Sequence, residues 1–348
     1  MENKILLQDL EELAGNTEFL EGLGNSRVLI TGATGLIGSQ LVMALLQMNR
    51  AYKSGIRVIA MARSEEKAKK LFGPQGGDGL SFYYGDIKDP IPDLGSVDYI
   101  VHCASATSSK YFVTNPVETI FTALSGTKQI LEFARKSKVK GMVYLSSLEV
   151  YGTPEPGQKT IGEQDYGFLD PLSVRSSYSE GKRMAECMCA AYASEYGVPV
   201  RLARLSQTFG PGVSYDDGRV FAEFARCVAE QRDIILHTAG NTVRSYCYTK
   251  DAISAVFYIL LKGTSGEAYN VTNMDTAVSI REMAELVCGL YPERGIRVKI
   301  EIPDDIGSYG YNPEMVIRLD SSKLQELGWK ATVDLSEMFE RMIQSSFL

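Results

Sequence analysis

Tyr178 and Lys182 form a Tyr-x-x-x-Lys pair that could move a proton in a substrate. Residues four apart lie on the same face of a helix, one turn apart, so the pair places an ammonium group beside a phenol. A free tyrosine has a pKa of about 10 and is a poor base at neutral pH. Because a nearby positive charge favours the phenolate, we expect Lys182 to lower the pKa of Tyr178 and to make it a usable acid or base.

A hydroxyl donor is also needed to align a substrate, and Ser147 is the candidate. It follows an apolar run at residues 141–145, which is typical of a buried strand. Parallel sheets place ligand-binding groups at such strand ends. Many helices carry a Tyr-x-x-x-Lys pair only as part of a solvated face, so the chemical interpretation also depends on Ser147 and on a glycine-rich turn earlier in the chain.

That turn lies at residues 31–38, which read Thr-Gly-Ala-Thr-Gly-Leu-Ile-Gly between an apolar run and a helical pattern. Strand, glycine turn and helix in this order predict a dinucleotide site, because glycine lets backbone N–H groups approach a pyrophosphate at the helix N-terminus. An ordinary glycine-rich turn is the alternative. The expected contacts are Gly32, Thr34, Gly35, Leu36, Ile37 and Gly38.

The choice between NAD and NADP depends on the next strand, at residues 56–62. In an NAD site, an acidic residue about 20 positions further on commonly holds the adenosine ribose. This strand ends instead in Ala62-Arg63-Ser64. Arg63 could pair with the 2′-phosphate of NADP and Ser64 could hydrogen-bond to it, or Arg63 is simply exposed at a strand end. Asp86 could bind the adenine amino group, or be a solvated strand-end residue.

An α/β fold must position these residues. Residues 27–47 indicate a strand, a turn and a helix, and the predicted strands that follow are 56–62, 80–87, 97–104, 141–152 and 198–205. Helices are predicted between them at 64–72, 115–136 and 176–196. Alternating strands and helices predict a doubly wound parallel sheet that is covered on both faces.

The rest of the chain divides around this sheet. An amphipathic pattern at 5–22 predicts a helical extension over residues 1–26, followed by the dinucleotide-binding domain over 27–205. The pattern becomes less regular after that, so residues 206–348 are predicted to form a smaller α/β substrate-binding region, with some chain crossing back to the sheet. Its expected helices are 218–231, 248–263, 278–290 and 320–345.

Composition excludes several classes of function. The 348 residues carry a net charge of −7 with a pI of about 5.2, so we expect neither a nucleic-acid nor an acidic-membrane partner. No run of 18 apolar residues predicts a membrane span, and the acidic N-terminus does not resemble a secretory signal. Six cysteines without Cys-x-x-Cys spacing and two histidines predict reduced thiols, no metal site and a cytoplasmic location.

Five motifs in order resemble the extended short-chain dehydrogenase/reductase family over about residues 27–335. They are TGATGLIG, GDI, VHCASA, SSLEVYG and YSEGK. The resemblance implies a Rossmann-type domain for NAD(P) and a C-terminal region for a nucleotide sugar. It implies catalytic roles for Ser147, Tyr178 and Lys182, with Tyr178 taking a proton from a sugar hydroxyl as hydride leaves. The implied dinucleotide contacts, beyond the glycine turn, Arg63, Ser64 and Asp86, are Ile87, Cys103, Ala104, Ser105, Tyr178 and Lys182.

Within that family the chain is most like UDP-glucuronate decarboxylases. They carry a Ser-Glu-Val-Tyr-Gly stretch, which the Leu-Glu-Val-Tyr-Gly at 148–152 resembles, and a helix like YSEGKR. The DGRV segment at 217–220, Val243-Arg244-Ser245 and the closing Leu-Gly-Trp also match or resemble their motifs. The resemblance implies transient oxidation of the sugar C4 and loss of carbon dioxide. Glu149 would assist proton delivery or sugar placement and Arg244 would bind the substrate. The alternatives are a structural carboxylate and a phosphate anchor without a catalytic role.

Other substitutions leave the reaction and the nucleotide base open. Leu148 stands where 4,6-dehydratases carry a proton-donating Asp and decarboxylases a serine, and Gln207 replaces an asparagine near the diphosphate. His237 and Thr238 replace a Tyr-Gly pair that brackets uracil in the family, so the base need not be uracil. A nucleotide-sugar 4-epimerase remains the main alternative. A 4,6-dehydratase, an NADPH-dependent keto-sugar reductase and a non-enzymatic dinucleotide sensor are further alternatives. The expected substrate contacts are Ser147, Gln207, Arg219, Arg244 and Arg318.

The resemblance also implies a homodimer. Family members pair through the helices that correspond to 115–136 and 176–196, which form a four-helix bundle. Apolar positions on these helices serve either that interface or the internal core. They are Ile120, Leu124, Met184, Met188 and Tyr192.

Overall fold

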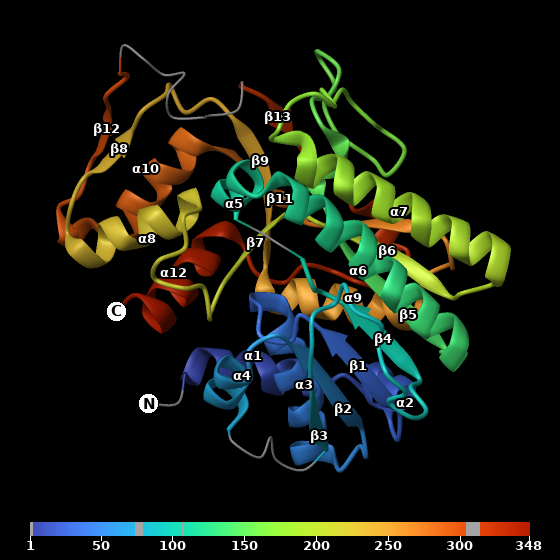
Figure 1. Ribbon diagram of the computed structural model, residues 1–348. Helices are drawn as coiled ribbons and strands as arrows, with labels where there is room; N and C mark the ends of the chain where they lie inside the picture. The colour runs from blue at the N-terminus through green and yellow to red at the C-terminus, as the bar shows by residue number, and fades with distance from the viewer. Residues whose placement is uncertain (1–2, 74–78, 106–107, 304–313) are drawn as a thin grey trace.

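Seven parallel strands form the central sheet of the computed structural model, in the order β10-β6-β5-β4-β1-β2-β3 (Figure 1). The structure describes residues 3–73, 79–105, 108–303 and 314–348. The strands are β1 Arg27–Thr31, β2 Arg57–Ala62, β3 Leu80–Tyr84, β4 Tyr99–His102, β5 Gly141–Ser147, β6 Val200–Leu205 and β10 Ala268–Val271. The strand order reverses between β1 and β4, and ligands bind at the carboxyl ends of strands beside such a point. The predicted α/β fold is therefore confirmed.

Helices cover both faces of this sheet, which explains why its strands are nearly continuous apolar runs. Val28 and Ile30 of β1 pack with α3 (Leu36–Tyr52) and α9 (Thr249–Lys262) in one buried cluster. Leu29 of the same strand points to the other face and packs with α6 (Pro116–Ser137) and α7 (Ser176–Tyr196). Helices α6 and α7 run side by side across that face (Figure 1). The smaller helices α4 (Glu65–Phe72) and α5 (Ser109–Thr114) follow β2 and β4.

Two short helices, not the single predicted one, form the N-terminal segment. Helix α1 spans Lys4–Ala14 and α2 spans Thr17–Leu23, and the side chains of Asn3 and Asn16 cap their first turns. Helix α1 packs against α3 and also reaches α12 (Leu335–Ser346). Its buried Asp9 accepts hydrogen bonds from Tyr248, at 2.6 Å, and from Arg341 of α12, at 2.8 Å.

A second buried cluster lies beside the sheet, around Phe209, Phe221 and Phe339. It is built by β7 (Gln207–Phe209), α8 (Val220–Glu230), β9 (Val243–Tyr248), β11 (Asn273–Ser279), α10 (Ile280–Leu290) and α12. Strand β9 pairs with β7, β11 and β13 (Val316–Ile317), while β8 (Ile234–Leu236) pairs with β12 (Val298–Ile300). Between these elements the chain returns to the main sheet as α9 and β10, so two cores share one interleaved chain.

Some predicted boundaries were wrong for local reasons. The strand predicted at 141–152 ends at Ser147 and continues as a 3-10 helix, Leu148–Tyr151. The helix predicted at 320–345 is two helices, α11 (Ser322–Gln325) and α12, because Gly328 turns the chain with a φ of 97°. Among the described residues, no helix is both long enough and apolar enough to cross a membrane.

Candidate active site

The glycine turn joins β1 to α3, and its geometry requires glycine. Gly32 has a φ of +64°, and a Cβ on it would lie 2.8 Å from the backbone of Ala104. A Cβ on Gly38 would lie 2.3 Å from the carbonyl oxygen of Gly32. Gly35 is the N-cap of α3 and is exposed. The turn therefore leaves the first N–H groups of a long helix open at the centre of the sheet, as a pyrophosphate site requires.

The end of β4 supports this turn. Thr31 hydrogen-bonds through its Oγ1 to Nδ1 of His102, at 2.7 Å, and accepts the backbone N–H of Ala104, at 3.2 Å. Burial lowers the pKa of His102 to about 3, so its ring is neutral and structural. Cys103, Ala104 and Ser105 are half-buried next to the turn. Their backbone lies where a dinucleotide on the α3 N-terminus would pass.

The predicted adenosine contacts lie at the ends of β2 and β3. Arg63 is exposed, and Ser64 caps α4 by accepting the N–H of Lys67 at 3.1 Å. Asp86 is half-buried and accepts the N–H of Lys88 at 2.9 Å. Ile87 is buried against α6. Thr34, Leu36 and Ile37 are half-buried at the start of α3. Together with the glycine cradle, which a Cβ would fill, these residues fit an NAD(P) site.

Lys182 and Tyr178 lie on α7, but their electrostatics differ from the sequence expectation. Lys182 is 3% exposed and donates to the carbonyl oxygen of Leu145 at 2.7 Å. Burial lowers the pKa of Lys182 to about 8, and it raises the pKa of Tyr178 to about 12. The Lys182 ammonium lies 5.8 Å from the centre of the Tyr178 ring. The prediction that Lys182 lowers the pKa of Tyr178 is therefore wrong for this structure, because desolvation dominates.

The groups that do lower the pKa of Tyr178 lie on its other sides. A hydrogen bond with Ser147, at the end of β5, lowers it, and so do the charges of Arg175 and Arg219. The charge of Glu149 raises it. The Tyr178 ring stacks on Phe112 of α5, with 4.2 Å between ring centres and 8° between ring planes. The phenol is thus fixed by packing and by one hydroxyl.

Glu149 lies in the 3-10 helix directly after Ser147. Its Oε2 accepts a hydrogen bond from Ser179 at 3.2 Å, and its Oε1 lies 3.5 Å from Nη2 of Arg175. Its charge also acts on Arg244 of β9, whose pKa is lowered by burial and raised by Glu149. The structure therefore gathers one carboxylate and several arginines around Ser147 and Tyr178.

The remaining predicted substrate residues are more spread out. Arg219 precedes α8, pairs with Asp217 at 2.6 Å and packs on Phe221. Gln207 begins β7 and is half-buried. Arg318 is exposed, and its carbonyl oxygen accepts the N–H of Ile161 at 2.8 Å. His237 directly follows β8. Its Nδ1 is 3.1 Å from the carbonyl oxygen of Glu301, which directly follows β12.

Sequence reasoning missed two residues of this site. Arg175 has a sequence signal, since it lies three positions before Tyr178 and therefore near the same face of the helix. Phe112 has none, because its contact with Tyr178 joins α5 to α7 across 66 positions of sequence and depends on the tertiary fold.

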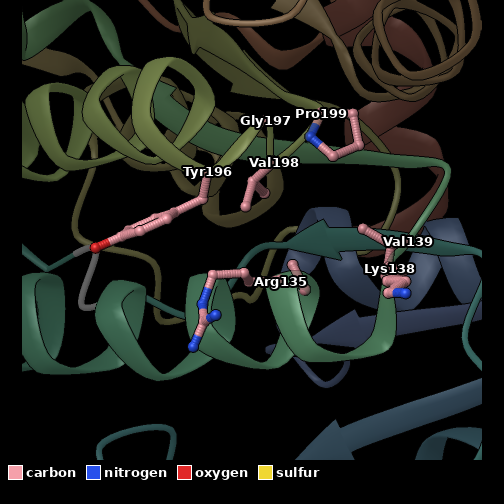
Figure 2. Close-up of a pocket in the computed structure, with 8 residues that line it drawn as sticks. Arg135, Lys138, Val139, Tyr196, Gly197, Val198 and Pro199 are labelled. Atoms are coloured by element: carbon pink, nitrogen blue, oxygen red, sulfur yellow. The ribbon is translucent and has the colours of Figure 1, made fainter.

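One further cavity contains none of the predicted site residues. A cavity of about 220 Å³ lies between the C-terminal ends of α6 and α7, and Figure 2 shows Arg135, Lys138, Tyr196 and Pro199 on its walls. Arg135 is already paired with Glu132 at 2.9 Å and lies over the Tyr196 ring. Within the described ranges, no group of three or more His, Cys, Asp or Glu residues could hold a metal ion.

Comparison with solved structures shows the same fold. A UDP-glucose 4-epimerase from Thermotoga maritima aligns with a TM-score of 0.77 at 23% identity, covering 92% of this chain and 98% of that one. A UDP-glucuronic acid 4-epimerase from Bacillus cereus aligns with a TM-score of 0.73 at 20% identity, again covering 92% and 98%. At these identities the likeness concerns architecture.

Sequence comparison is more specific. UDP-glucuronic acid decarboxylase 6 of Arabidopsis thaliana is 32% identical over 324 residues, which are 92% of this chain and 88% of that protein. UDP-glucuronic acid decarboxylase 1 of Danio rerio is 29% identical over 94% of this chain and 74% of that protein. The resemblance to UDP-glucuronate decarboxylases that the motifs indicated is thereby confirmed. Residues 28–272, from β1 through the glycine turn and α7 to the end of β10, match one family description, and the chain belongs to the NAD dependent epimerase/dehydratase family.

Proposed function

We propose that this protein is a UDP-glucuronate decarboxylase that oxidises C4 of the sugar transiently. The observation that carries the proposal is the Glu149 carboxylate, which contacts Ser179 and Arg175 and whose charge, like the Ser147 side chain, acts on Tyr178. Similarity to decarboxylases of this substrate over about nine-tenths of the chain supports it. A simple 4-epimerase has no evident use for a carboxylate at this position.

The chemistry follows from the side chains. Tyr178 accepts the proton of the C4 hydroxyl, while Ser147 aligns that hydroxyl. Bound NAD(P) supplies a hydride acceptor and later a hydride donor. The C4 ketone makes the substrate a β-keto acid, whose carboxylate leaves because the electron pair spreads onto the ketone oxygen. Glu149 and Arg244 then guide proton delivery to C5. Lys182, held by its hydrogen bond to the Leu145 carbonyl oxygen, would hold the nicotinamide ribose.

We propose NADP as a second possible cofactor, although NAD is the cofactor of the family. Arg63 occupies the position of the missing acid at the end of β2, and no hydrogen bond or ion pair engages its guanidinium within the described ranges. An unpaired arginine there favours a 2′-phosphate.

We propose further that the protein is a cytoplasmic homodimer. Val117, Ile120 and Phe121 of α6 and Met184 of α7 are large apolar residues that are 36% to 60% exposed. Leu124, Met188 and Tyr192 are half-buried along the same helices. A second copy would cover this surface with the same two helices. All six cysteines are free thiols, as in proteins of reducing compartments.

The test is incubation of the protein with UDP-glucuronate and NAD or NADP. A decarboxylase releases carbon dioxide and leaves a UDP-pentose, and the dinucleotide shows no net turnover. A uronate isomer would identify a 4-epimerase, and net loss of NADPH a reductase. Mass spectrometry of the small molecules released on denaturation would name the bound dinucleotide. Sedimentation equilibrium tests the dimer, with Phe121→Glu as the variant expected to give monomers.

A further inference from the structure

Arg175 lies between the two groups that the proposed reaction uses to handle protons. It is the N-cap residue of α7, three positions before Tyr178. Its Nη2 is 3.5 Å from Oε1 of Glu149, which is a long contact for a charged pair. Its Nη1 is buried and has no hydrogen-bond partner in the part of the chain that the structure describes. A buried guanidinium N–H without a partner is costly, so its presence calls for an explanation.

Phe112 connects Arg175 to the phenol by packing. The Arg175 guanidinium carbon lies 5.2 Å from the centre of the Phe112 ring, and the same ring stacks on Tyr178. Ser177, between the two in sequence, donates its hydroxyl to the carbonyl oxygen of Phe112 at 3.2 Å. Arg175 and Tyr178 therefore pack on the same Phe112 ring. A change in the Arg175 side chain would alter the packing of the Tyr178 ring.

The charges around Tyr178 distinguish Arg175 from the other cations. The ammonium of Lys182 donates to the Leu145 carbonyl oxygen and lies 5.8 Å from the centre of the Tyr178 ring. Arg219 forms a short pair with Asp217, at 2.6 Å, which offsets much of its charge. Glu149 acts against the phenolate. Within the described ranges, the one carboxylate that pairs with Arg175 is Glu149, at 3.5 Å, so its charge is less compensated than that of Arg219.

We propose that Arg175 is a positioning residue of this active site, which holds the Glu149 carboxylate and, through the Phe112 ring, the Tyr178 phenol in the places that proton transfer requires. The inference rests on the proposed roles of Tyr178 and Glu149. An arginine fork can bind a carboxylate through both terminal nitrogens. The unpaired Nη1 leaves the second bond of the fork available to the Glu149 carboxylate.

Two variants separate geometry from charge. Arg175→Lys keeps the charge and loses the fork, whereas Arg175→Gln loses the charge. We expect the turnover number of Arg175→Gln with UDP-glucuronate to fall roughly 30- to 100-fold at neutral pH and to recover in part at higher pH. The KM should change less than about threefold, and Arg175→Lys should lose about tenfold at most. Arg135→Gln, a matched change on α6 far from Tyr178, should leave turnover and KM unchanged.

A second readout needs no substrate. Protein labelled with fluorotyrosine and loaded with NAD is titrated by fluorine NMR, and the signal missing from Tyr178→Phe assigns Tyr178. Because the phenol of fluorotyrosine is more acidic than that of tyrosine, the labelled ring titrates below the pKa of Tyr178 itself. Its midpoint should move to higher pH in Arg175→Gln and stay near the wild-type value in Arg175→Lys.

The two readouts distinguish the possible failures. If the wild-type protein releases no carbon dioxide from UDP-glucuronate, the proposed function fails, and the NMR midpoint still decides the role of Arg175. An unmoved midpoint in Arg175→Gln overturns the inference. A large rise in KM at constant turnover number overturns it as well, since Arg175 would then be a substrate ligand.

Discussion

Two arginines lie beside α7, and their surroundings differ. Arg204, on β6, is 1% exposed and uses every side of its guanidinium. Its Nε and Nη2 bond to Glu186 at 3.0 and 2.6 Å, its Nη1 to the Glu163 carbonyl oxygen at 2.7 Å, and its Nη2 also to the Tyr166 hydroxyl at 2.5 Å. Arg175, at the helix start, has one long contact and an unpaired Nη1.

The difference separates structural from functional charge. The Arg204 network joins β6, α7 and the segment after Ser147, so it fixes the frame in which Tyr178 and Glu149 lie. A fully bonded buried pair has nothing left to offer a ligand, and its loss would be seen in stability. A partly bonded arginine gives up stability in its resting state and keeps a donor for another state. Four substitutions test this division.

The largest effect is expected from Tyr178→Phe. Without the hydroxyl no proton can be taken from the sugar, so turnover should fall by about 10³- to 10⁴-fold. The ring stack on Phe112 is kept, so the free energy of unfolding should change by about 1 kcal/mol, the contribution of the Ser147 hydrogen bond. Steady-state kinetics and urea denaturation measure the two quantities. Turnover within tenfold of the wild type would contradict the proposed role.

Arg204→Met should act in the opposite way, on stability. It leaves Glu186, which is 6% exposed, without its partner, and breaking a buried pair in this way costs about 3–5 kcal/mol. Denaturant unfolding measures the loss. The double variant Arg204→Met with Glu186→Leu should recover part of it, because no charge is then left unpaired. A single variant as stable as the wild type would show that the network is dispensable.

Asp9 extends the comparison to a buried carboxylate far from Tyr178. Burial raises its pKa from 3.8 to about 6. The hydrogen bond from Tyr248 and the charges of Arg341 and Lys250 lower the pKa, and the charge of Glu12 raises it further. A raised folded-state pKa contributes stability that is fully present below about pH 4 and is lost as the pH rises through about 6.

Relative to Asp9→Asn, the wild-type protein should therefore gain up to roughly 3 kcal/mol of unfolding free energy between pH 7 and pH 4. Urea denaturation of both proteins at a series of pH values measures this difference, and the other titrating groups cancel. Parallel curves for the two proteins would show that Asp9 is charged throughout.

Arg63 adds a third arginine to the comparison of Arg204 with Arg175. It is exposed and has no partner among the described residues. If its role is to bind a 2′-phosphate, Arg63→Asp should weaken NADP binding about tenfold or more and leave or improve NAD binding. Titration calorimetry with both dinucleotides measures the preference. Unchanged affinity for NADP would place Arg63 among ordinary solvated residues.

The sheet and the glycine turn could be predicted because their causes are local. Apolar runs of strand length and the glycine spacing at 32, 35 and 38 determine them within a short window, and the positive φ of Gly32 explains one of these glycines directly. The 3-10 helix after Ser147 was missed because its turn continues an apolar, strand-like pattern.

Electrostatics could not be predicted in the same way. Helix geometry predicts from the sequence that Tyr178 and Lys182 lie on one face of α7. The direction of a pKa shift, in contrast, depends on desolvation by the whole fold. The Leu145 carbonyl oxygen that engages Lys182 belongs to a strand 37 positions away. Arg175 became visible as a candidate only when its distance to Glu149 and its unpaired nitrogen were known.

The contact between α1 and α12 has a consequence for biosynthesis. Asp9 leaves the ribosome 239 residues before Tyr248 and 332 residues before Arg341, the two groups that bond to it. Until both have emerged, α1 has no place to bury its carboxylate, and Leu10 and Leu13 stay without part of their native cover. The contact of α1 with α12 must therefore form after its packing on α3, so nascent chains should depend on chaperones longest at this buried carboxylate.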